Sequence, residues 1–88
     1  MKINDSFLRH DSDGESLLIP TGSAKFSGIV RGNKTLGEIV GFLMNETTRD
    51  EVVSAMLAKY GEGAPRDAIE RDVDRVITEL RGIGALDE

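Results

Sequence analysis

The spacing of apolar residues changes once along the chain, at Asn33. Before this position apolar residues come in short runs bounded by turn-forming residues, which is typical of strands; after it they recur every three or four residues, which is typical of helices. The pattern therefore predicts an α+β protein, with three antiparallel strands at the N-terminal end followed by three helices. This is a winged-helix-like arrangement, and its length of 88 residues suits a single domain over 1–88.

The first two strands are expected to form a hairpin over residues 7–20. The segment 11–15, with Asp13-Gly14 inside it, has turn chemistry because Asp-Gly tolerates positive φ. Pro20 ends the second strand. Because Leu17, Leu18 and Ile19 are all apolar, this strand is predicted either to be covered on both faces or to lie centrally between the first and third strands.

The third strand is predicted over residues 26–31, on an edge of the sheet. It contains β-branched Ile29 and Val30, and Gly28 offers a point where another backbone can approach closely. Gly32 and Asn33 are expected to stop it. From these residues alone, an ordinary core strand with a bulge glycine is the simpler interpretation, and a strand completed by another chain is the functional one.

Three amphipathic helices are predicted after Asn33. The first begins at an Asn33 or Thr35 cap, and the second at a Thr48 cap with Glu51 three residues later, the pattern of a capping box. The third covers 65–81 and starts at a proline. The expected apolar stripes are Leu36, Ile39, Val40 and Leu43; Val52, Val53, Met56, Leu57 and Tyr60; and Ile69, Val73, Val76, Ile77 and Leu80. After the third helix the chain is expected to fold back on the core, and its last two residues to fray.

Composition favours a binding protein over an enzyme. The net charge is −5 and there is no cysteine, which excludes a disulfide framework, thiolate zinc ligands and a thiol nucleophile. His10 is the only histidine and is expected at the surface. The acidic segment 11–15 lacks the length and order of an EF-hand loop. No catalytic residues, metal ligands or cofactors are therefore predicted, and the short apolar runs favour a cytoplasmic protein with no membrane contact.

DNA binding is the alternative that a winged-helix-like pattern leaves open, because such folds place a helix in the major groove. Charge argues against it. A groove-reading helix should be basic, whereas the third helix carries four arginines and five acids: Arg66, Arg71, Arg75 and Arg81 against Asp67, Glu70, Asp72, Asp74 and Glu79.

Taken in order, these segments resemble the PqqD-like family. The resemblance rests on 7–9, 17–20, 26–30, 33–35, the Thr48–Glu51 box, Asp72-Val73, Leu80 and 84–86, and it covers nearly the whole chain. Each motif alone is a capping or core pattern, so their order and spacing carry the signal. Gly32 and Val40 depart from the family, which usually has an apolar residue and often an aromatic there; the protein of the PQQ pathway and a relative that serves another peptide both stay open, and we favour the relative.

The resemblance implies a non-catalytic peptide-binding protein, a RiPP recognition element. Such a protein binds the leader region of a ribosomally synthesised precursor peptide by strand addition and presents it to a modifying enzyme, often a radical SAM protein. The implied peptide-binding residues lie on the third strand and the third helix: Phe26, Ser27, Gly28, Ile29, Val30 and Arg31, with Asp72, Arg75, Val76 and Glu79. The alternative without a binding role is that Val76 is an ordinary core residue and that the three charged helix residues lie on a solvent-exposed face. An edge strand also permits a homodimer by strand pairing.

Overall fold

The computed structural model describes residues 1–12, 15–22, 28–63 and 65–88. Its larger sheet is antiparallel, in the order β2-β3-β4, with β2 at Phe7–Ser12, β3 at Glu15–Pro20 and β4 at Val30–Gly32. The predicted α+β architecture is confirmed, with β3 in the centre and β4 on an edge. Both hairpin strands are longer than predicted, and residues 13–14 of the predicted turn lie outside the described residues.

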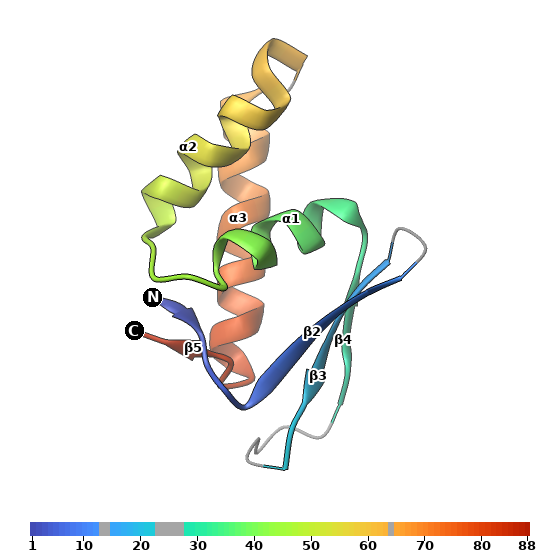
Figure 1. The fold of residues 1–88 in the computed structure, drawn as a ribbon. Coiled ribbons are helices and arrows are strands. Elements are labelled where there is room, and N and C mark those ends of the chain that lie inside the picture. Colours follow the sequence, from blue (N-terminus) through green and yellow to red (C-terminus); the bar gives the residue numbers. More distant parts are fainter. Residues whose placement is uncertain (13–14, 23–27, 64) are drawn as a thin grey trace.

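The three helices lie on one side of this sheet, with α1 against it (Figure 1). They are α1 (Lys34–Phe42), α2 (Arg49–Tyr60), which continues into a short 3-10 turn at Gly61–Gly63, and α3 (Arg66–Gly82). Helix α1 lies between the sheet and the other two helices, in contact with β3, α2 and α3. The predicted caps are present: the Asn33 side chain accepts from the Leu36 amide at 3.2 Å, and Thr48 Oγ1 accepts from the Glu51 amide at 3.2 Å.

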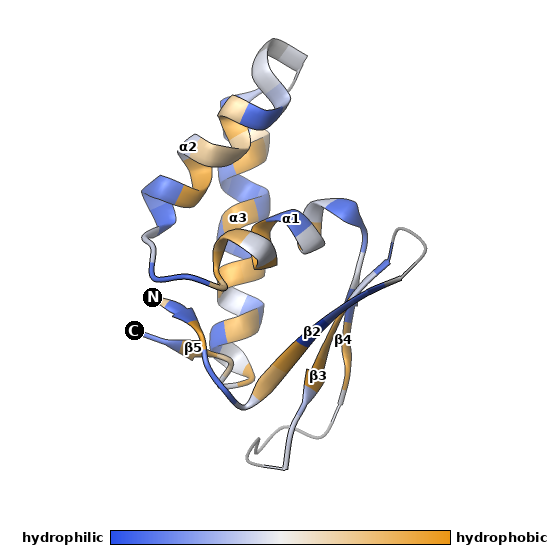
Figure 2. Ribbon diagram, in the orientation of Figure 1, coloured by the Kyte–Doolittle hydropathy of each residue, from blue (hydrophilic) through white to orange (hydrophobic). Residues whose placement is uncertain are grey.

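The core lies between the sheet and α1, and between α1 and the other helices. Phe7 and Leu18 reach it from the sheet, and all five predicted stripe residues of α3 are buried. The hydropathy colouring shows this division, with apolar positions of the helices turned inward (Figure 2). On β3 only one face is fully covered: Leu18 is buried, whereas Leu17 and Ile19 are half-buried on the side away from the helices. Of the two alternatives predicted for this strand, the central position is therefore confirmed, and full cover of both faces is not.

A second sheet joins the two ends of the chain. Strand β1 (Lys2–Ile3) pairs antiparallel with β5 (Leu86–Asp87), with Ile3 opposite Leu86. The last residue, Glu88, accepts two hydrogen bonds from the Arg81 guanidinium at 2.7 and 2.9 Å. The last residues do not fray as predicted, because they bond to β1 and to α3.

Candidate functional site

The open edge of β4 is the feature that the sequence singled out. In the described part of the sheet, β4 pairs with β3 on one side only, with Leu18 opposite Val30 and Ser16 opposite Gly32. The backbone groups that alternate toward the other side are a template for a further strand. The strand begins later than predicted, because Gly28 and Ile29 lie before it. It also includes Gly32, which was predicted to stop it. In the same register Gly28 would face Pro20, which has no N–H to donate.

A cavity of about 240 Å³ lies between the end of β4 and helix α3. It is lined by residues of β4, the turn into α1, α1 itself and α3: Arg31, Gly32, Asn33, Thr35, Leu36, Arg75, Val76 and Glu79. Four of the ten predicted peptide-binding residues thus meet in one place, Arg31 from the strand with Arg75, Val76 and Glu79 from the helix. This is the strand-to-helix groove that the sequence predicted.

The remaining predicted residues lie elsewhere. Asp72 lines a neighbouring cavity between α2 and α3. Ile29 is 52 % exposed just before β4, and Gly28 precedes it. Val30 packs against the core from β4. Phe26 and Ser27 lie outside the described residues.

Two arginines give the β4 cavity its positive groups. The side chain of Arg31 is 73 % exposed and lies 3.5 Å from Glu15, and that of Arg75 is 66 % exposed and lies 3.7 Å from Asp72. Exposed pairs of this kind contribute little to stability. Both guanidinium groups are therefore free to exchange their present partners for a carboxylate or a carbonyl of a guest chain.

Gly32, Asn33, Thr35 and Leu36 line the cavity as well, and the sequence had assigned them only to the end of the strand and the start of the helix. The glycine is needed there, because a Cβ on Gly32 would overlap the side chain of Leu36. The contact explains the first departure from the family pattern. A signal existed in the sequence: a cap residue with an apolar residue three positions later, directly after an edge strand, places the first turn of the helix beside that strand.

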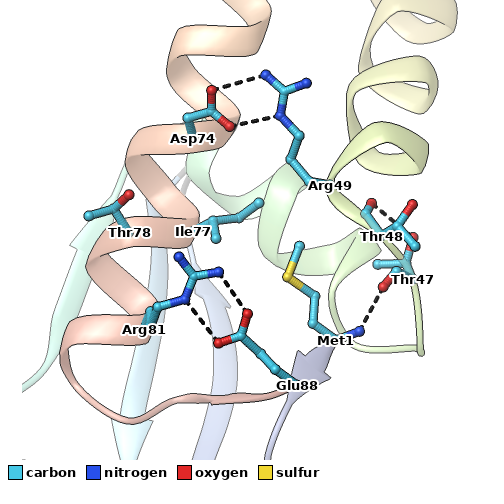
Figure 3. Close-up of a pocket in the computed structure, with 9 residues that line it drawn as sticks. All are labelled: Met1, Thr47, Thr48, Arg49, Asp74, Ile77, Thr78, Arg81 and Glu88. Atoms are coloured by element: carbon cyan, nitrogen blue, oxygen red, sulfur yellow. Dashed lines mark hydrogen bonds and ion pairs between the residues drawn. The ribbon is translucent and has the colours of Figure 1, made fainter.

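A cavity of about 460 Å³ lies on another face of α3, along the same stretch of the helix (Figure 3). It lies between the paired termini, the start of α2 and the face of α3, and is lined by Met1, Thr47, Thr48, Arg49, Asp74, Ile77, Thr78, Arg81 and Glu88. Its charged groups bond to one another. Arg49 donates to both carboxylate oxygens of Asp74, at 2.8 and 3.0 Å, and Arg81 pairs with Glu88.

These pairs also shift the protonation of the groups. The hydrogen bonds from Arg49 lower the pKa of Asp74, and those from Arg81 lower the pKa of Glu88. With each cation already neutralised by a carboxylate, the cavity offers a ligand no unpaired charge among these four side chains. This cavity lies where the two termini meet α2 and α3, and we do not assign the function to it.

The described residues contain no group of three or more histidine and acidic side chains that could hold a metal ion. Within the same ranges, no helix is both long enough and apolar enough to cross a membrane.

Comparison with solved structures first identifies the fold. The structure of TbiB1 in complex with the TbiA(beta) leader peptide superimposes with a TM-score of 0.78 and 23 % sequence identity, covering 99 % of this chain and 95 % of TbiB1. The family follows from the sequence: residues 15–86 match the model of coenzyme PQQ synthesis protein D (PqqD). The chain belongs to the PqqD family. No curated protein matches the chain.

Proposed function

We propose that residues 1–88 form one non-catalytic peptide-binding domain, a RiPP recognition element. It holds the leader region of a ribosomally synthesised precursor peptide as an added strand on β4 and presents that peptide to a modifying enzyme such as a radical SAM maturase. Membership of the PqqD family supports the class of function. We place leader binding in the cytoplasm, because a chain without cysteine does not need an oxidising compartment to form disulfides.

The observation that carries the proposal is the open edge of β4 beside a lined cavity. A guest strand gains main-chain hydrogen bonds from the edge, while alternate side chains enter the groove and give specificity. Arg31 and Arg75 stand on the two sides of that groove, and Val76 supplies an apolar floor. In TbiB1, a protein of the same fold, a leader peptide is bound.

Holding the leader near the enzyme raises the effective concentration of substrate, which requires no chemistry from the binding domain. The charge of α3 does not favour the DNA-binding alternative, because this helix carries four arginines against five acidic residues. A helix that reads the major groove needs its cations turned toward phosphates and bases.

The test is a pair of proline substitutions in β4, Val30→Pro and Arg31→Pro. Adjacent amides of a strand point to opposite edges, so one of the two bonds to β3 and the other faces the open edge. One variant should lose an internal hydrogen bond and melt at a lower temperature. The other should keep its melting temperature and bind the leader about fivefold more weakly, the equivalent of one hydrogen bond of about 1 kcal/mol.

The probe is a synthetic leader segment, to be sought among the short open reading frames that neighbour the gene, and its binding is measured by fluorescence anisotropy. Val30→Ala and Arg31→Ala are the matched controls, since they remove the same side chains but keep the amides. Strand addition is ruled out if both proline variants stay folded and bind this leader as tightly as the parent.

A further inference from the structure

A second cavity continues the proposed peptide groove between helices α2 and α3. It has a volume of about 140 Å³ and is lined by Thr35, Met56, Tyr60, Ala68, Ile69 and Asp72. Ligand pockets for whole small molecules usually exceed about 300 Å³, so this cavity suits one side chain rather than a free ligand. Met56 and Ile69 are buried core residues that form its floor, whereas Thr35 and Asp72 are half-buried and polar.

The aromatic wall of this cavity is fixed in place. Tyr60 is 38 % exposed, which is unusual for the last residue of an apolar stripe, and its hydroxyl donates to Glu38 Oε1 at 2.6 Å. Lys59 Nζ lies 3.2 Å from the other oxygen, Glu38 Oε2. The ring is thus tied to α1 while one face stays open, so the apolar surface exists before any guest arrives.

The two cavities are neighbours. Thr35, at the start of α1, lines both the β4 cavity and the cavity between α2 and α3. On α3, the residues that line the cavity between α2 and α3 come two turns before those that line the β4 cavity. Asp72 lines the second cavity and pairs with Arg75, which lines the first. Seven residues of a helix rise by about 10 Å. An extended peptide covers that distance with about three residues, at roughly 3.3 Å each.

We propose that a large apolar side chain of the bound leader segment enters the cavity between α2 and α3, about two to four residues along the peptide from the residue that occupies the β4 cavity. This inference rests on the proposed function and specifies its substrate: a peptide with an uncharged aliphatic or aromatic anchor at a set distance from its β-paired part. We assign the cavity to a side chain of the same bound peptide because the cavity adjoins the β4 groove. The carboxylate of Asp72 at the rim disfavours an acidic residue at the anchor position.

The experiment fills the cavity without touching the strand. Ala68→Met extends a side chain into it from α3, and Ala58→Met is the matched control, since Ala58 is exposed on α2 and does not line the cavity. The probes are random peptides of about twelve residues displayed on phage and selected on the unmodified protein, long enough to span both cavities. We expect the selected peptides to share a large apolar residue, and Ala68→Met to weaken their binding about tenfold, as loss of one buried apolar side chain requires. Ala58→Met should bind like the parent.

The outcomes separate this inference from the proposed function. Selected peptides that bind Ala68→Met as tightly as the parent, or that share no apolar residue, overturn the anchor. If their binding is at the same time lost in one folded β4 proline variant, strand addition stands without the anchor. A library that yields no binder, or binders indifferent to both proline substitutions, overturns the proposed function itself. Should Ala68→Met melt early, Tyr60→Ala removes one wall of the cavity and must weaken binding while the protein stays folded; unchanged binding there counts against the anchor.

Discussion

Gly37 and Gly41 lie one turn apart on α1, and an added methyl group would meet a different obstacle at each. At Gly37 a Cβ would overlap Ser16 Oγ and lie 3.0 Å from Ser16 Cβ, so strand β3 leaves it no room. At Gly41 a Cβ would lie 3.0 Å from the Arg9 guanidinium, the far end of a flexible side chain. Side chains of the sheet, Ser16 from β3 and Arg9 from β2, therefore lie against the two glycines.

We expect Gly37→Ala to destabilise the protein and Gly41→Ala not to. Overpacking against Ser16 costs about 1–3 kcal/mol, which exceeds the roughly 1 kcal/mol that alanine gains over glycine in a helix. At Gly41 the guanidinium moves aside, and the helical gain remains. Urea unfolding of both variants measures the difference. Equal stabilities for the two would show that Ser16 does not limit the approach of α1 to β3.

At the scale of elements, the sequence predicted those that carry local signals. The helices were predicted because a cap and an apolar stripe lie within one segment, as for Thr48 and the residues after it. The small sheet was missed because each of its strands has two residues and the partner lies at the opposite end of the chain. The third strand was predicted too long because Ile29 is β-branched, a preference that does not show where pairing to β3 stops.

The same reasoning applies to the candidate site. Arg31, Arg75, Val76 and Glu79 line one cavity, in the place that the resemblance to the PqqD-like family implied, and their role in peptide binding stays a prediction. The cavity between α2 and α3 was not predicted, since Tyr60 was interpreted as a buried stripe residue. Its exposure depends on the bond to Glu38 on another helix, and no local pattern reports such a contact.

Helices α1 and α2 are joined by the Glu38–Tyr60–Lys59 contacts, and this joint should respond to acid. Burial alone would raise the pKa of Glu38, but the hydrogen bond from Tyr60 and the Lys59 ammonium outweigh it and lower that pKa below its ordinary value. A carboxylate with a lowered pKa contributes stability above the ordinary value of 4.5, and this contribution is lost as pH falls through the folded-state pKa.

We therefore expect Glu38→Gln to lower the melting temperature at neutral pH and to flatten its fall between about pH 5 and pH 3. Thermal melts followed by circular dichroism across this range provide the measurement. Asp5→Asn, which removes an exposed carboxylate outside both helices, is the control and should keep the slope of the parent. An unchanged slope in Glu38→Gln would mean that the joint does not depend on the charge of Glu38.

For the whole molecule, net charge bears on the class of partner. With a net charge of −5 overall and more acidic than basic residues on α3, the protein should repel a polyanion at long range. Fluorescence anisotropy with random duplex DNA at low salt should show no binding below roughly 100 μM, because few phosphate contacts are available to release counterions. A tight complex with a steep dependence on salt would favour the DNA-binding alternative over peptide capture.

The pairing of β1 with β5 brings the two ends of the chain together, on the side of the molecule away from β4 (Figure 1). A surface tether, a fluorescent label or a fused enzyme attached at either end therefore starts from the same point. An attachment at that point leaves the open edge of β4 exposed to solution. A short linker would suffice for capture on a solid support, whereas an enzyme fused at either end needs a linker long enough to pass around the helices to the bound peptide.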